Sequence, residues 1–328
     1  MELTTLNQFV SYIEDFFFTR LTDAKKADAI VICNPSHAIC KSPVILHSKK
    51  SLEDHIRYIQ EHQIKKAVVV AEDIGFLCQC PSLEYLWIIP AFSANNFDYS
   101  PLYKMPNIKW LQCETMYGKD EDRIANVDYS KIHGLQRLAV TGARGHHGMA
   151  SVRGLKTLYM DLGQPSSGTL KGAFDGSVLE NLVISQSSIC SLEGLEQAKQ
   201  IKRLELSYNR KLADISSVSE VRESLVWLDI ENCGRIQDFS VLSELQNLEL
   251  LRLRGSNTLP DLSFLKNMTK LEFFVMTMDV ADGDLSMCKR IPYVAIKNRK
   301  HFSHKDRDFS KSSSSPSSPR VISEYENY

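Results

Sequence analysis

Adjacent histidines and closely spaced cysteines are the residues of this chain that could do chemistry. His146 and His147 stand in the run Arg144-Gly145-His146-His147-Gly148, and Cys78 and Cys80 are one residue apart. A metal site needs further ligands at a fitting spacing, and neither run has such partners beside it. We therefore expect a loop around the histidines, no metal ligands and no bound cofactor.

The cysteines as a set indicate a reducing compartment. The eight are scattered along the chain, at Cys33, Cys40, Cys78, Cys80, Cys113, Cys190, Cys233 and Cys288. Several of them fall where a small buried apolar residue would serve. The N-terminus lacks the basic start, apolar core and small-residue cleavage site of a secretory signal. Its most apolar stretch, Phe16-Phe17-Phe18, is flanked by charged residues. We expect a cytoplasmic protein with reduced thiols and no membrane segment.

No catalytic motif stands out in the chain. A phosphate-cradling glycine loop, a nucleophile elbow and a pair of spaced carboxylates are all missing from the sequence. The basic run 297–301 could touch phosphate, but Asp306 and Asp308 dilute it, and a solvated end is the simpler interpretation. The net charge of −1 gives no overall attraction to nucleic acid or to acidic membranes. We expect no catalytic residue, no nucleic-acid partner and no membrane partner.

A fixed period of about 23 residues governs most of the chain. Apolar residues recur at a start position and three and five residues later, as in Leu179, Leu182 and Ile184. Eleven starts fit this frame, at Ile64, Leu83, Ile108, Leu135, Leu155, Leu179, Ile201, Leu225, Leu248, Leu271 and Ile291. Each start predicts a short strand whose side chains alternate between a core and an open face.

The second half of each unit repeats as well. Apolar residues follow Ile201 at Leu212, Ile215, Val218 and Val221, and the units that start at Leu225 and Leu248 have apolar residues at the same offsets. A spacing of three suits a 3-10 segment, in which residues three apart stack on one side. Asp and Ser recur together before these segments, where they can cap free N–H groups, in Asp214-Ile215-Ser216, Asp238-Phe239-Ser240 and Asp261-Leu262-Ser263.

These residues resemble the leucine-rich repeat family, and the Asp-apolar-Ser element is similar to the short repeats of bacterial internalin-type proteins. The resemblance implies an α/β solenoid with a parallel concave sheet and short 3-10 or irregular convex segments. The family places an Asn eight residues after the start, which bonds backbone groups of the convex turn. Only Asn209 matches, with Cys233 as an accepted substitute, while Ser187, Ser256 and Asp279 depart from the pattern.

The flanks are predicted to close the array, because a repeat buries its core only between neighbours. Residues 1–63 are expected to form an N-terminal α/β cap with a strand at 29–33 and a helix that begins with a capping box at Ser51 to Asp54. A small independent domain is the alternative. Residues 64–301 are expected to form the solenoid of about eleven units. Residues 302–328 are expected to be a disordered tail, because Ser and Pro dominate after Phe309.

The residues two, four and six after each start are predicted to point to the concave face, and all three tryptophans fall there. Exposed Trp, Tyr and Arg dominate binding sites because each gives a large, rigid contact with a polar handle. The alternatives are that large side chains fill the groove of a curved sheet, and that the charged ones satisfy one another. The candidate partner-binding residues are Tyr85, Trp87, Trp110, Tyr159, Arg203, Glu205, Trp227, Asp229, Glu231, Arg252 and Arg254.

The pattern as a whole favours a non-enzymatic protein-binding module that is monomeric when free. A bacterial cytoplasmic immunity or scaffold protein is the more specific hypothesis. The alternative is a host-directed effector, or a substrate-recruiting subunit of an enzyme such as a ubiquitin ligase. A catalytic domain needs some 50 to 200 residues of its own, and only about 60 N-terminal residues lie outside the array.

Overall fold

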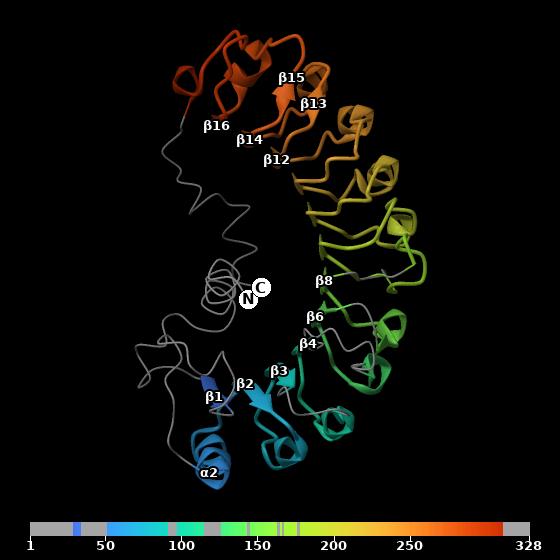
Figure 1. The fold of residues 1–328 in the computed structure, drawn as a ribbon, viewed down its shortest axis with the longest axis vertical. Helices are drawn as coiled ribbons and strands as arrows, with labels where there is room; N and C mark the ends of the chain where they lie inside the picture. Colours follow the sequence, from blue (N-terminus) through green and yellow to red (C-terminus); the bar gives the residue numbers. More distant parts are fainter. Residues whose placement is uncertain are drawn as a thin grey trace. The chain divides into compact units, whose positions relative to one another are not determined.

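The computed structural model describes residues 29–33, 51–90, 97–114, 126–142, 145–162, 165, 167–175 and 178–310. Cys40 and Arg144, named in the sequence analysis, lie outside these ranges, as do the predicted cap residues 1–28 and 34–50. The chain divides into two compact units, Met1–Gly154 and Leu155–Tyr328. Each unit is built from short parallel strands with 3-10 segments along the opposite side (Figure 1).

The first unit has five strands that pair in parallel in chain order. They are β1 Ala29–Cys33, β2 Lys66–Ala71, β3 Tyr85–Pro90, β4 Trp110–Glu114 and β6 Arg137–Thr141. A separate pair joins β5 Val127–Asp128 to β7 His146–His147. The connections carry helix α2 Leu52–His62 and the 3-10 segments Gly75–Gln79, Ser100–Lys104, Tyr129–Lys131 and Met149–Ser151.

The second unit contains seven short strands of the main parallel sheet. Its strands are β8 Thr157–Asp161, β9 Asn181–Ser185, β10 Arg203–Ser207, β11 Trp227–Glu231, β12 Leu250–Arg254, β14 Phe273–Met276 and β16 Tyr293–Ile296. Short strands β13 Thr258–Leu259 and β15 Asp279–Val280 pair beside them. The 3-10 segments are Leu195–Gln197, Ser216–Val221, Ser240–Glu244, Ser263–Asn267, Ser286–Arg290 and Asp306–Asp308.

Every predicted repeat start precedes a strand by two residues, so the frame inferred from the sequence is confirmed. Leu179 precedes β9, for example, and Leu182 and Ile184 within that strand are fully buried. The parallel register is constant, with Leu182, Leu204 and Leu228 opposite one another on β9, β10 and β11. One row of apolar side chains therefore stacks on the next, and the core continues along the unit.

The 3-10 segments bury apolar residues that recur at every third position, as the spacing predicted. Leu212, Ile215, Val218 and Val221 are all buried under β10 and its neighbours. The carboxylate of Asp214 accepts the N–H of Ser216 at 2.8 Å, and Asp238 and Asp261 accept the N–H groups of Ser240 and Ser263 in the same way. These bonds satisfy a donor that a short helical segment leaves free, as the recurring Asp-apolar-Ser element predicted.

The N-terminal elements that the structure describes also follow the prediction. Helix α2 begins at a capping box in which Ser51 Oγ accepts the N–H of Asp54 and the Asp54 carboxylate accepts the N–H of Ser51. Strand β1 pairs in parallel with β2, Ala29 opposite Lys66. The sheet of the first unit thus extends one strand beyond the eleven predicted starts.

Residues 302–310 were expected to belong to the tail, and the structure instead folds them against β16. Phe302 and Phe309 are buried. The Asp306 carboxylate accepts the N–H of Ile296 at 2.8 Å, and the Ser310 carbonyl accepts the N–H of Val294 at 3.2 Å. These two N–H groups point away from β14, so the segment satisfies the edge of the last strand. The predicted tail from residue 311 onward lies outside the described residues.

Candidate partner-binding face

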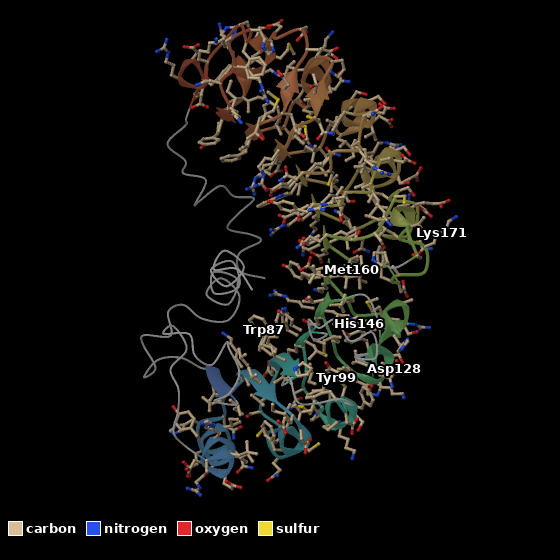
Figure 2. The ribbon with its side chains drawn as sticks, viewed as in Figure 1. Trp87, Tyr99, Asp128, His146, Met160 and Lys171 are labelled. Atoms are coloured by element: carbon tan, nitrogen blue, oxygen red, sulfur yellow. The ribbon has the colours of Figure 1, made fainter. Side chains whose placement is uncertain are left out.

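The open face of each sheet carries the residues two, four and six positions after each repeat start. On β10 the core side chains Leu204 and Leu206 are buried, while Arg203, Glu205 and Ser207 between them are half-buried. In Figure 2, Trp87 lies on the open side of the first unit and Lys171 on the opposite side of the second. The predicted side-chain alternation is therefore correct, and the open face is the place to look for a binding surface.

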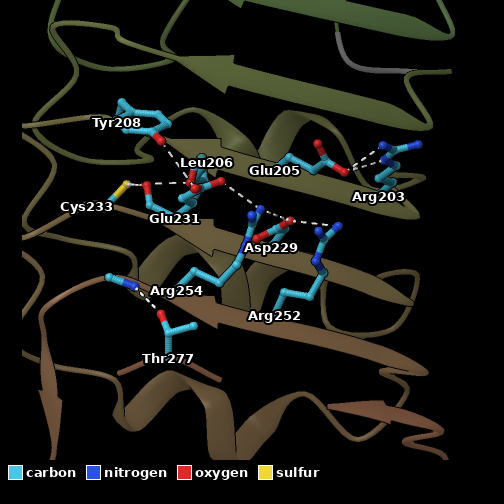
Figure 3. Close-up of polar contacts among 11 residues, drawn as sticks. Arg203, Glu205, Leu206, Tyr208, Asp229, Glu231, Cys233, Arg252, Arg254 and Thr277 are labelled. Atoms are coloured by element: carbon cyan, nitrogen blue, oxygen red, sulfur yellow. Dashed lines mark hydrogen bonds and ion pairs between the residues drawn. The ribbon is translucent and has the colours of Figure 1, made fainter. Parts of the chain in front are cut away.

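Six charged side chains on β10, β11 and β12 form ion pairs, as one separate pair of Arg203 with Glu205 and one connected network of Asp229, Glu231, Arg252 and Arg254 (Figure 3). Arg203 makes two contacts with Glu205 Oε1, at 2.8 Å from Nε and 2.6 Å from Nη2. Asp229 Oδ2 lies 3.2 Å from Arg252 Nη1 and 2.9 Å from Arg254 Nη2. Arg254 Nη2 also lies 2.8 Å from Glu231 Oε2. The alternative that these charges satisfy one another therefore describes the geometry well.

The register explains why these side chains meet. Glu205, Asp229 and Arg252 occupy directly opposite positions on β10, β11 and β12, as do Glu231 and Arg254 two residues further on. Side chains opposite each other on neighbouring strands come close enough for ion pairing. The network thus follows from repeat spacing alone, with no special backbone geometry.

Asp229 is the buried centre of the network, with 3% of the residue exposed. Burial raises the pKa of its carboxyl group, and the cationic Arg252 and Arg254 act in the opposite direction. Its Oδ1 atom has no hydrogen-bond partner among the described residues, whereas Oδ2 receives both arginines. The carboxylate therefore fixes two guanidinium groups on the open face at once.

Trp227 was predicted to be an exposed anchor, and the structure buries it, with 5% exposed. It forms an apolar cluster with Leu250 and Phe273, with the partly buried Tyr293 packed against it. These four residues are in register on β11, β12, β14 and β16. The Arg203 guanidinium lies 4.3 Å from the centre of the Trp227 ring. Large side chains at directly opposite positions on neighbouring strands cover one another. The exposure of one residue therefore cannot be predicted from its own position in the repeat.

Trp87 and Trp110 require the same correction in the first unit, with 0% and 3% exposed. Both lie on the predicted open-face positions, opposite bulky neighbours such as Tyr85 and Gln112. A buried tryptophan cannot act as a contact residue without rearrangement. Tyr85, half-buried with the Lys66 ammonium 5.9 Å from its ring centre, keeps some accessible surface.

The open face of the second unit retains accessible residues on both sides of Asp229. Tyr159, Arg203, Glu205, Glu231, Arg252 and Arg254 are half-buried there. The residues predicted as partner contacts thus separate into two groups. The three tryptophans and Asp229 are buried, and the others are accessible. Tyr85 and Tyr159 belong to different compact units.

Tyr208 is a surface aromatic that the sequence analysis did not single out. It is 44% exposed and donates its hydroxyl to Glu231 Oε1 at 3.3 Å (Figure 3). Its backbone is left-handed, with φ of 55°, and Gln186 and Asn232 at the equivalent positions share that conformation. The conformation thus belongs to the repeat. The signal in the sequence was an aromatic residue directly before Asn209. It lies one position beyond the open-face positions, which are two, four and six residues after each repeat start.

Cys80, Cys233 and His146, also considered for chemistry, are held within the fold. Burial raises the pKa of Cys80 and Cys233 to about 11, so both thiols are poor nucleophiles. His146 lies between the Tyr129 hydroxyl, 2.8 Å from Nδ1, and the Thr141 carbonyl, 3.2 Å from Nε2. In the basic run, the Lys305 ammonium donates to the carbonyls of residues 299, 300 and 302. Among the described residues no helix is both long enough and apolar enough to cross a membrane.

These observations define the fold: the chain has the architecture of a leucine-rich-repeat solenoid. Strands of about five residues recur in parallel at the predicted starts, and 3-10 segments return the chain on the other side. Asn209 behaves as the resemblance implied, donating to the Ile184 carbonyl and accepting from the Ser187 N–H. Cys233, eight residues after the next start, directs its thiol to the Leu206 carbonyl.

The solved structures that are similar to this chain have low sequence identity and TM-scores below 0.5. No protein-family model matches the chain. An internalin of Listeria monocytogenes, InlF, is 17% identical with a TM-score of 0.48, over 73% of this chain and 77% of that one. The functional domain of InlJ from the same organism is 16% identical with a TM-score of 0.46, over 74% of this chain and 49% of that one. A leucine-rich-repeat protein of Leptospira interrogans is 11% identical with a TM-score of 0.42, over 77% of this chain and 83% of that one.

Proposed function

We propose that the chain is a non-enzymatic scaffold that binds a protein partner on the open face of its second unit, the face expected from the sequence to be concave. The observation that carries this proposal is the set of half-buried Tyr159, Arg203, Arg252 and Arg254 side chains on one sheet. Tyrosine and arginine supply most of the binding energy in protein interfaces. A cytoplasmic immunity or scaffold protein would use such a face to hold its partner.

Rigidity supports the same proposal. The arginines are already fixed by ion pairs to Glu205, Asp229 and Glu231, so a partner finds them in place. Little side-chain entropy is then lost when they are buried in an interface. A sheet with parallel strands on both sides of each contact also moves little on binding.

The test is to capture the partner from the native organism and to measure its affinity for variants by calorimetry. Tyr159→Ala and Arg203→Ala should each cost about 2 kcal/mol, roughly thirtyfold in affinity. Lys266→Ala is the matched control, because Lys266 is exposed in the 3-10 segment Ser263–Asn267 on the opposite side. Melting curves show whether each variant is folded. Affinity unchanged in both open-face variants, with folding intact, would refute this binding face.

A further inference from the structure

The open face changes charge along the second unit. The acidic residues Glu205, Asp229 and Glu231 lie on β10 and β11, whereas basic residues follow on β12 and after β16. Lys297 continues the ladder one residue past β16, because its N–H donates to the Met276 carbonyl at 2.9 Å. It is exposed. The basic end of this face therefore comprises Arg252, Arg254 and Lys297.

Short apolar side chains lie among these cations. Val275 on β14 and Ala295 on β16 are in register with Arg252, and both are half-buried. Tyr293 borders them, its ring 5.4 Å from that of Phe273. The side chains between the cations on this face are therefore short and apolar. We name the surface formed by Arg252, Arg254, Lys297, Val275, Ala295 and Tyr293 the basic-apolar surface.

Arg252 offers unused donors on this surface. Its one ion pair within the described part of the chain is the contact of Nη1 with Asp229, and 33% of its side chain is exposed. A guanidinium carries five N–H donors and matches a carboxylate with two of them. Arg203 differs, since it contacts Glu205 through two nitrogens and covers Trp227. Asp229 holds Arg252 in place from below, so its outer donors are oriented in advance.

We propose that the basic-apolar surface takes a segment of the partner protein that carries acidic and small apolar side chains. A carboxylate of that segment pairs with the outer edge of Arg252, a second lies near Lys297, and an apolar side chain covers Val275 and Ala295. Charge-assisted bidentate bonds of this kind are the strong ones, and complementary charge sets the orientation of a partner. This inference rests on the proposed function and adds the chemistry of the partner.

The probe for the test is a fluorescein-labelled peptide, Gly-Glu-Leu-Glu-Ala-Glu-Leu-Gly, with the matched peptide in which Lys replaces each Glu. Fluorescence anisotropy with the full chain measures both affinities at low salt. We expect the acidic peptide to bind at least tenfold more tightly than the basic one. Arg252→Gln should weaken the acidic peptide about tenfold, since one charge-assisted pair is lost, and Lys297→Gln should weaken it severalfold. Arg307→Gln is the matched control, because the Arg307 side chain is 88% exposed outside the sheet.

The outcomes separate this inference from the proposed function. Equal binding of the two peptides, or an Arg252→Gln variant equal to Arg307→Gln, overturns the acidic partner. If the captured partner still depends on Tyr159 and Arg203 in that case, the proposed binding face stands. The chain's own residues Glu324 and Glu326 are a competing source of carboxylates. A Glu324→Gln, Glu326→Gln double variant that binds the acidic peptide tenfold better would assign the surface to this chain instead of to a separate partner.

Discussion

Asp229 shows how one buried residue can orient two side chains of the open face. Its Oδ2 atom receives Arg252 and Arg254, and its burial leaves almost none of it for an incoming protein. Burying a carboxylate is costly unless cations compensate it, and the two arginines provide that compensation. Their outer surfaces remain accessible as a result. In the proposed function its role is therefore indirect, through the position of its neighbours.

His146 gives a pH-dependent prediction at the same scale. The Thr141 carbonyl can only accept, so Nε2 carries the proton, and Nδ1 accepts from the Tyr129 hydroxyl. Burial is the main cause that lowers the pKa of His146 to about 4. The unfolded chain takes up this proton near pH 6.5 and the folded chain does so only near pH 4. Stability from this residue is therefore complete above pH 6.5 and falls by up to about 3 kcal/mol as the pH drops to 4.

NMR titration of the His146 ring, together with urea unfolding at several pH values, tests this prediction. A His146→Gln variant should lose that share of the pH dependence between 6.5 and 4, because Gln does not titrate. Titration of the ring with a midpoint near 6.5 in the folded protein would contradict the buried neutral form.

At the scale of the elements, the apolar period predicted the strands because it is read from many residues at once. The eleven starts, the 3-10 segments and the helix after Ser51 all follow from spacing and capping. The exposure of the tryptophans could not be predicted, because it depends on neighbours about 23 residues away. Trp227 is covered by a row that includes Leu250 and Phe273. The accessibility of a large open-face residue therefore depends on the residues directly opposite it on neighbouring strands.

Asn209 links neighbouring repeats, and its replacement should weaken the second unit. Its side chain is fully buried and satisfies the Ile184 carbonyl at 2.8 Å and the Ser187 N–H at 2.9 Å. Asn209→Ala leaves both groups without that partner, which should cost about 3 kcal/mol. Cys233→Ala at the equivalent position removes only weak thiol contacts, 3.6 Å to the Leu206 carbonyl and 3.5 Å to the Glu231 carbonyl, and should cost less than half as much. Guanidinium unfolding measures both, and equal losses would mean that cavity formation, rather than hydrogen bonding, sets the cost.

For the molecule as a whole, the physical problem is that each end of a repeat array leaves a strand edge and an apolar surface open. In the second unit, residues 302–310 cover the open edge of β16. Phe302 and Phe309 are buried there, and the Asp306 carboxylate accepts the N–H of Ile296. This closure was not predicted from the sequence, because charged and polar residues surround the two phenylalanines. Two buried aromatic residues and two bonds to edge N–H groups were enough to fold it.

Truncation at two points tests that closure. A chain that ends at Ser310 should melt within about 1 °C of the full chain, since the Ser-Pro composition that follows adds little apolar burial. A chain that ends at His301 loses both aromatic side chains and exposes the N–H groups of Val294 and Ile296. Burial of the two phenylalanines alone is worth roughly 3 to 6 kcal/mol. The melting temperature should therefore fall by several degrees, and light scattering should show association through the open edge. A chain ending at His301 that melts like the one ending at Ser310 would place the closure of the second unit elsewhere.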